Sequence, residues 1–241
     1  MTGWFPNPGE AGDILRWLAV LMLSGWLCVP LARRLVPDVP FFAQFALAKC
    51  LGWVIAGYAG WLPAALGVLP FSGTGGSAAF LTLFATWFTA SRGSRADPMP
   101  WRQIVVAELA FVTLFAFGLA QRVTHANLAY LEKPTNLGFL TALLHAETMP
   151  PAEAWFSGNQ INYYYLGHVT SAVFAQMAAV QPDHAYQLSM ASLFALTGVG
   201  IAASVIAILP AAGKTVAQAA GALAALAALY AGNLHAFLYN V

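Results

Sequence analysis

The chain has 241 residues, of which 60% are hydrophobic and only 8% are charged. A soluble globular domain carries about 25% charged residues, so this chain has too few to cover a surface that faces water. Its net charge of +1 argues against a nucleic-acid-binding domain, which gathers Lys and Arg on one face. Cys28 and Cys50 lie inside apolar runs, which favours packing over a disulfide or a metal site. The composition predicts an all-α integral membrane protein.

Seven apolar runs approach the length of about 20 residues that a membrane-spanning helix needs. They cover residues 14–32, 41–62, 76–90, 103–119, 163–180, 188–209 and 216–238. The third run is short, and residues 66–71 before it could instead form a re-entrant segment. We therefore predict about seven transmembrane helices, with the exact number open around residues 62–90.

The runs divide into two predicted regions. Residues 1–102 hold about three spans, and residues 103–241 hold one span, a polar loop at residues 122–162 and about three further spans. An apolar helix runs almost to Val241 with no polar tail. We therefore expect the native protein to continue beyond that residue.

The arginines predict how the chain is oriented. Those next to the first, third and fourth runs are Arg33, Arg34, Arg92, Arg95 and Arg102. All of them fall on one side if four spans precede the loop, and the positive-inside rule makes that side cytoplasmic. Arg16, at the other end of the first run, is a single opposing charge. The loop at residues 122–162 then faces away from the cytoplasm, and we expect the inner membrane of a bacterium.

Two ionisable residues, Lys49 and Glu108, lie inside predicted spans. Such groups face the interior of a helix bundle and pair with one another or with polar groups. We predict this for both residues, and a structural contact explains them at least as well as a functional one. They also prompt a transporter hypothesis, which requires more polar residues along the spans than the sequence contains.

The polar loop has three parts. Residues 132–136 form a predicted charged turn, since Pro134 disfavours helical backbone at the residue before it. Residues 137–145 fit a short amphipathic helix on the membrane surface. Residues 150–162 return to the membrane, with the aromatic pair at 155–156 as interfacial anchors.

Three consecutive tyrosines, Tyr163–Tyr165, open the fifth predicted helix. An aromatic belt at the lipid boundary would explain a generic triplet. Successive helical residues point about 100° apart, so at least one tyrosine should turn into the bundle. Tyr164 and His168 are four residues apart and would share a helix face. His168 would lie one turn below the surface, where an ionisable group is a functional candidate.

Several motifs in this region resemble the YYY membrane protein family, which is named for its YYYxG motif. They are Trp155-Phe156-Ser157-Gly158, Ile161-Asn162-Tyr163-Tyr164-Tyr165-Leu166-Gly167-His168, Glu132-Lys133-Pro134, Pro150-Pro151 and Glu108 within Ala-Glu-Leu-Ala-Phe. The resemblance covers residues 104–241, the start of a domain that is normally several hundred residues longer. The family is distantly similar to the GT-C glycosyltransferases, membrane enzymes that use polyprenyl-phosphate sugars and hold a catalytic carboxylate in their first large outward loop.

The resemblance implies a site for sugar transfer on the outer face of the membrane. An acceptor hydroxyl needs a base, and the leaving phosphate needs cations or a divalent metal ion. Glu132 is the candidate base or metal ligand, and His168 is a second catalytic candidate. The candidate substrate-binding residues are Lys133, Arg122, Asn162, Tyr163, Tyr164, Tyr165 and Trp155.

Glu132 and Lys133 could instead be an ordinary solvated charge pair, which contributes little to stability or binding. The chain could likewise be a non-catalytic structural or accessory subunit of a membrane complex instead of an enzyme. Its expected partners are membrane lipid, a polyprenyl-phosphate sugar and other membrane subunits. The expected cofactor, if there is one, is a divalent cation.

Overall fold

The computed structural model describes residues 8–92, 100–124, 132–153, 155–156, 158–209 and 213–230. These residues form α-helices and contain no β-strand, which confirms the all-α class. The helices are α1 (Pro8–Leu35), α2 (Phe41–Ala65), α3 (Gly75–Ser91), α4 (Trp101–Thr124), α5 (Lys133–Leu144), α6 (Leu166–Ala178), α7 (Pro182–Ile208) and α8 (Lys214–Tyr230).

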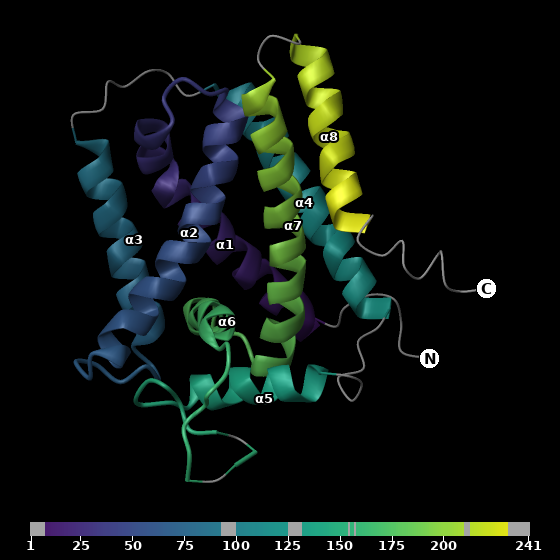
Figure 1. The fold of residues 1–241 in the computed structure, drawn as a ribbon. Coiled ribbons are helices and arrows are strands. Elements are labelled where there is room, and N and C mark those ends of the chain that lie inside the picture. Colours follow the sequence, from purple (N-terminus) through teal and green to yellow (C-terminus); the bar gives the residue numbers. More distant parts are fainter. Residues whose placement is uncertain are drawn as a thin grey trace.

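The bundle has two distinct ends (Figure 1). One end, which we call the loop end, carries the α2–α3 connection, α5 and residues 145–165. The other, which we call the arginine end, carries the last turn of α1, the last turn of α3, the first turn of α4 and the α7–α8 connection. The guanidinium of Arg34 donates a hydrogen bond to the carbonyl of Arg92 at the arginine end. The described members of the two predicted arginine clusters therefore lie on the same side, while Arg95 lies outside the described residues.

Four described helices are long and apolar enough to cross a membrane: Gly9–Leu35, Phe41–Ala65, Trp101–Val123 and Pro182–Ile208. α3 and α8 have 17 residues each, or about 25 Å at 1.5 Å per residue, and they run beside the longer helices (Figure 1). Residues 231–238 of the last predicted span lie outside the described residues. Seven spans are therefore not confirmed.

The largest difference from the sequence prediction is α6, which we expected to be a span over residues 163–180. It has only 13 residues, or about 20 Å, and Figure 1 shows it end-on among helices that run lengthwise. Residues 169–175 of α6 are all buried. A helix that is apolar all round suits a protein core as well as lipid, so composition alone could not separate the two.

The position of α6 changes the course of the chain after the loop. Because α6 does not cross the bundle, α7 runs from the loop end to the arginine end, and α8 runs back (Figure 1). Lys214, the first residue of α8, therefore lies at the arginine end, where it adds another cation.

Close backbone approach holds α2 against its neighbours. A Cβ atom on Gly52 would lie 2.7 Å from the backbone carbonyl of Ser24 in α1, and one on Gly57 would lie 2.1 Å from the hydroxyl oxygen of Thr170 in α6. Small residues of this kind let helices pack closely in lipid. Cys28 and Cys50 are free thiols in the same packed region, as predicted.

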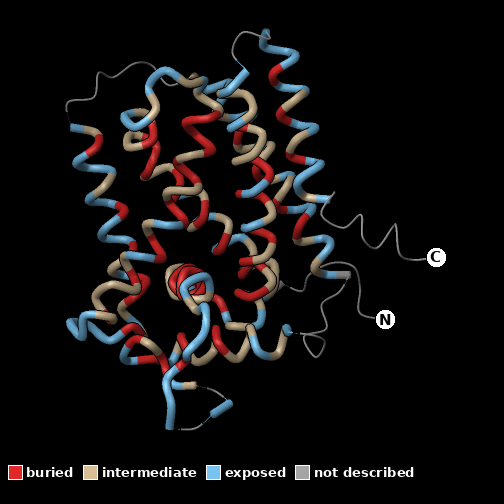
Figure 2. The backbone as a smooth tube through the Cα atoms, in the orientation of Figure 1, coloured by how far each residue is buried: buried red, intermediate tan, exposed pale blue. Residues whose placement is uncertain are grey.

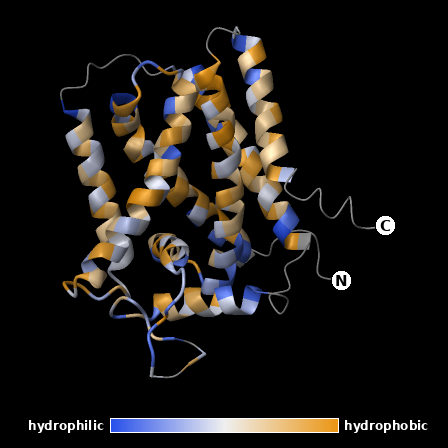
Figure 3. Cartoon of the chain, viewed as in Figure 1, coloured by the Kyte–Doolittle hydropathy of each residue, from blue (hydrophilic) through white to orange (hydrophobic). Residues whose placement is uncertain are grey.

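The burial pattern agrees with a membrane protein. Buried residues concentrate on α2, α6 and α7 in Figure 2, while α3 and α8 expose much of their surface. These exposed helices are largely hydrophobic in Figure 3. Leu81 on α3 and Leu223 on α8 are among the exposed apolar side chains. An apolar outer surface suits contact with lipid and would be unusual in a soluble monomer.

A helix, α5, is present where the amphipathic helix was predicted, and it begins four residues earlier than expected. Pro134 lies in the first turn of α5, where its missing N–H would have had no partner within the helix. The predicted turn at residues 132–136 is therefore mostly helical. The apolar side of α5 packs on the bundle through Phe139, Leu140 and Leu143, which are buried in the protein.

Candidate functional site

An aromatic cluster at the loop end brings together parts of the predicted site. The ring of Phe139 on α5 lies 5.7 Å from that of Tyr163 and 5.6 Å from that of His168, between ring centroids. The rings of Tyr163 and Tyr164 are 5.1 Å apart. Aromatic contacts at these distances are favourable beyond the area that they bury. Phe139 therefore contacts both His168 and the first tyrosine of the triplet.

The tyrosines precede α6 instead of opening it, since Tyr165 is the residue before its first turn. Tyr165 turns inward, and its hydroxyl accepts a hydrogen bond of 3.3 Å from Trp61 Nε1 on α2. The expectation that one tyrosine points into the bundle is confirmed. Tyr164 is 85% exposed and lies outside the helix, so it does not share a helix face with His168.

His168 occupies the first turn of α6 and is half-buried. Burial holds the pKa of its imidazole below the ordinary value, because the interior disfavours the charged form. The ring is therefore neutral at neutral pH. A neutral imidazole can accept or donate a hydrogen bond, but it does not offer a phosphate a full positive charge.

Glu132 and His168 are not brought together by the described contacts. Glu132 is exposed at the beginning of α5. Phe139, the contact of His168 on that helix, lies seven residues further along, about 10 Å by the rise of an α-helix. The two candidate catalytic residues therefore lie at different positions on the loop end, and the role of Glu132 stays a prediction.

Other predicted binding residues lie on the loop end. Trp155 is exposed and its indole lies against α5, where a Cβ on Gly138 would be 3.5 Å from Trp155 Nε1. Asn162 is exposed and Lys133 is half-buried. Ser157, within the family motif, lies outside the described residues. Among the described residues, no group of three His, Cys, Asp or Glu side chains could hold a metal ion.

Two side chains of α7 hold Arg122, one of the predicted substrate-binding residues. Its Nε donates a hydrogen bond of 2.7 Å to Gln187 Oε1 on α7. The guanidinium carbon lies 5.6 Å from the centroid of the Tyr186 ring, within the range of a cation–π contact. Its Nη2 is enclosed and has no hydrogen-bond partner among the described residues. Arg122 therefore keeps an unused donor at the loop end.

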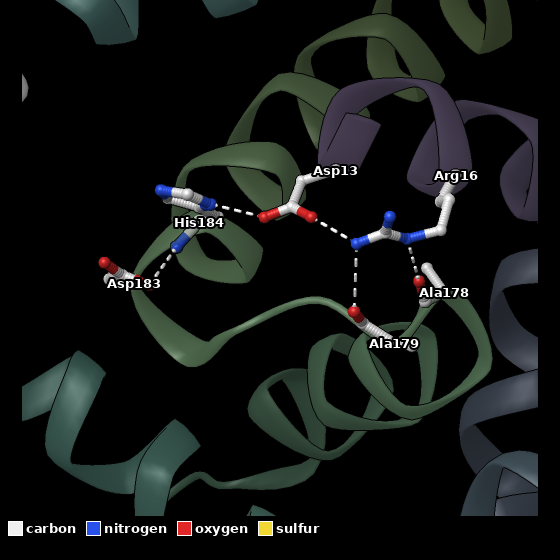
Figure 4. A network of polar contacts seen from close by, with 6 residues as sticks. All are labelled: Asp13, Arg16, Ala178, Ala179, Asp183 and His184. Atoms are coloured by element: carbon white, nitrogen blue, oxygen red, sulfur yellow. Dashed lines mark hydrogen bonds and ion pairs between the residues drawn. The ribbon is translucent and has the colours of Figure 1, made fainter. Parts of the chain in front are cut away.

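A polar network at the same end was not predicted (Figure 4). Asp13 on α1 accepts hydrogen bonds from Arg16 and, at 2.6 Å, from His184 Nδ1 on α7. Arg16 also donates to the carbonyls of Ala178 and Ala179, at 3.0 and 3.3 Å. These carbonyls end α6, where a cation is favourable. Arg16 is thus compensated internally, which explains why it opposes the other arginines.

The Lys49–Glu108 prediction is confirmed. Lys49 Nζ on α2 lies 2.9 Å from Glu108 Oε2 on α4, and Trp26 Nε1 on α1 donates a hydrogen bond of 2.8 Å to Glu108 Oε1. The rings of Phe45 and Phe111 lie 4.8 and 4.6 Å from the ammonium. The pair is therefore enclosed by aromatic side chains and joins three helices, which suits a structural contact.

Residues 55–241 match the model of a family described as uncharacterized membrane protein (DUF2298). The chain belongs to the DUF2298 family. No curated protein and no solved structure matches it. The DUF2298 match begins within α2 and includes α5, the tyrosines, His168 and His184, whereas Asp13 and Lys49 precede it.

Proposed function

We propose that this DUF2298 protein is a GT-C-like glycosyltransferase, or the N-terminal part of one. It transfers sugar from a polyprenyl-phosphate donor to an acceptor hydroxyl, and the loop end is its working surface. A donor of this kind keeps its phosphate at the membrane boundary, so the groups that bind it belong at one end of the bundle. The motif resemblance to the YYY family motivates the reaction type.

The observation that carries the proposal is Arg122. It is a cation fixed by Gln187 and Tyr186 at the loop end, with an Nη2 donor that lacks a partner among the described residues. An enclosed donor without a partner costs about 1–3 kcal/mol. A phosphate oxygen would satisfy this donor with a charge-assisted hydrogen bond, for which Arg is well suited.

The remaining roles follow from position. Glu132 lies exposed at the beginning of α5, where it can act as the base or hold a divalent cation against the phosphate. Lys133 follows it and adds positive charge. The exposed rings of Tyr163, Tyr164 and Trp155 offer apolar faces with polar edges to the sugar and the lipid chain.

Glu132→Gln tests this proposal in full-length protein reconstituted with polyprenyl-phosphate sugars. We expect sugar transfer to fall below detection, because the amide is neither a base nor an anionic metal ligand. Glu147→Gln is the matched control, since Glu147 is another exposed acid at the loop end, and it should retain activity. Wild-type rates in Glu132→Gln would remove Glu132 from the mechanism. A wild-type protein that transfers no sugar would favour the accessory-subunit alternative.

We also propose the orientation that the cations support, with the arginine end in the bacterial cytoplasm. The cations at that end among the described residues are Arg33, Arg34, Arg92, Arg102 and Lys214. An excess of Lys and Arg marks the cytoplasmic side of a membrane protein. The loop end, with its bound lipid donor and any partner subunits, then lies outside the cytoplasm.

Labelling with a membrane-impermeant maleimide tests this orientation. Glu153→Cys at the loop end and Lys214→Cys at the arginine end are placed separately in a Cys28→Ala, Cys50→Ala background. In intact spheroplasts we expect Glu153→Cys to react and Lys214→Cys to react only after permeabilisation. The reverse pattern would contradict the proposed orientation.

A further inference from the structure

The network in Figure 4 contains a histidine whose ring is oriented by a carboxylate. His184 lies in the first turn of α7, and its Nδ1 is 2.6 Å from Asp13 Oδ2. A carboxylate can only accept a hydrogen bond, so Nδ1 carries the proton. In the neutral ring the lone pair is then on Nε2, which points away from Asp13 (Figure 4). The His184 side chain is 36% exposed.

Asp13 is itself held in place. It is 9% exposed, and its other oxygen accepts a hydrogen bond from Arg16. Arg16 in turn is fixed by the carbonyls of Ala178 and Ala179 at the end of α6. Neither the carboxylate nor the ring can therefore turn without breaking contacts to a second helix. Such an arrangement selects one tautomer of the histidine and stabilises its protonated form during proton transfer.

The oriented histidine lies on the same helix, α7, that holds the proposed phosphate-binding arginine. His184 and Gln187 are three residues apart on α7, and residues at this spacing are neighbours on one helix face. Gln187 is the residue that holds Arg122 through its Nε. The first turns of α7 therefore carry both the oriented histidine and the residue that holds the fixed cation.

We propose that His184 is the catalytic base for sugar transfer and that Asp13 is its positioning residue. This inference rests on the proposed function and makes it more specific. His184 Nε2 takes the proton of the acceptor hydroxyl while that oxygen forms a bond to the anomeric carbon of the sugar. The bond between the anomeric carbon and the phosphate oxygen breaks, and polyprenyl phosphate leaves with the electron pair. Glu132 then serves as the metal ligand of its two predicted roles.

If His184 and Asp13 had a purely structural role, they would serve as a link between α7 and α1. That link needs only a donor near the position of Nδ1, and an asparagine amide provides one. A structural role also makes no use of Nε2. His184→Asn therefore separates the two roles, since it keeps a donor for Asp13 and removes the base.

The experiment compares His184→Asn and His184→Ala with wild-type full-length protein, using a polyprenyl-phosphate sugar and an acceptor in proteoliposomes. We expect kcat to fall at least about 100-fold in both variants, the usual contribution of general base catalysis, while the Tm of His184→Asn stays unchanged. Added imidazole should partly restore His184→Ala. Asp13, Asp183 and Glu10 face His184 and hold the pKa of its imidazole above the ordinary value, with Arg16 beside Asp13. The wild-type rate should therefore fall as the pH falls through this raised pKa and His184 takes up a proton, and His184→Asn should lose this dependence.

Each other result overturns the inference in a distinct way. Wild-type activity in His184→Asn would make the pair a structural link while leaving the proposed function intact. If activity falls only together with Tm and imidazole does not restore it, the His184–Asp13 pair is likewise a structural link and the proposed function stays intact. Absence of sugar transfer in the wild-type protein would overturn the proposed function, and the role of His184 as its base with it.

Discussion

Lys49→Met is expected to lower the free energy of unfolding by about 3–5 kcal/mol, as the loss of one partner from a buried ion pair does. Lys49 is 1% exposed and its ammonium is the charged partner of Glu108. Methionine fills a similar volume, so the packing against Phe45 and Phe111 is largely kept. The cost arises because the Glu108 carboxylate stays inside the bundle with only the Trp26 hydrogen bond. The change in the free energy of unfolding is measured on detergent-solubilised protein, with circular dichroism as the signal.

Two further variants make this prediction specific. Lys49→Met combined with Glu108→Gln should recover most of the lost stability, because replacing both charges removes the unpaired ion. Lys214→Met is the control, since Lys214 is exposed at the start of α8, and it should change stability by less than about 0.5 kcal/mol. A Lys49→Met protein as stable as wild type would mean that the ion pair does not hold α2 to α4.

The Lys49–Glu108 contact could be predicted from sequence because the apolar runs offer these two charged side chains few other partners. A charge inside an apolar run must find a polar partner, and each of these two runs offers one charge near its middle. The His184–Asp13 contact could not be predicted in this way. Its partners lie 171 residues apart and near the ends of their helices, where water is an equally good partner. Only the packing of α7 beside α1 brings them together.

The loop end was predicted in part. The periodicity of residues 137–145 predicted a helix with one apolar side, and α5 buries Phe139, Leu140 and Leu143 on one side. The sequence could not show that this side packs on the protein, because lipid and a protein core select the same residues. The same ambiguity made α6 look like a span. Its true length depends on where the helix ends, and Ala179, with a φ of 51°, ends it in a left-handed conformation that alanine rarely adopts.

Phe174→Ala tests directly whether α6 is a core helix, and we expect it to lower the free energy of unfolding by about 3 kcal/mol. Phe174 is fully buried, and its ring stacks 4.5 Å from that of Trp53 on α2 and lies 5.9 Å from that of Trp17 on α1. Truncation of a buried phenylalanine costs about 3–5 kcal/mol in soluble proteins. The lower end applies here, since the unfolded side chain can stay in an apolar environment and only the packing is lost.

A phenylalanine on an outward-facing helix provides the matched control. Phe80 on α3 is exposed, so in the membrane lipid can fill the space that Phe80→Ala leaves, and stability should change by less than about 1 kcal/mol. If α6 were a lipid-facing span, the two substitutions would have similar small effects. A large difference between them, measured by unfolding in the same detergent, would mean that this apolar run forms the core around which α1 and α2 pack. In that case α5 and the His184 network at the loop end would pack against a rigid helix, α6.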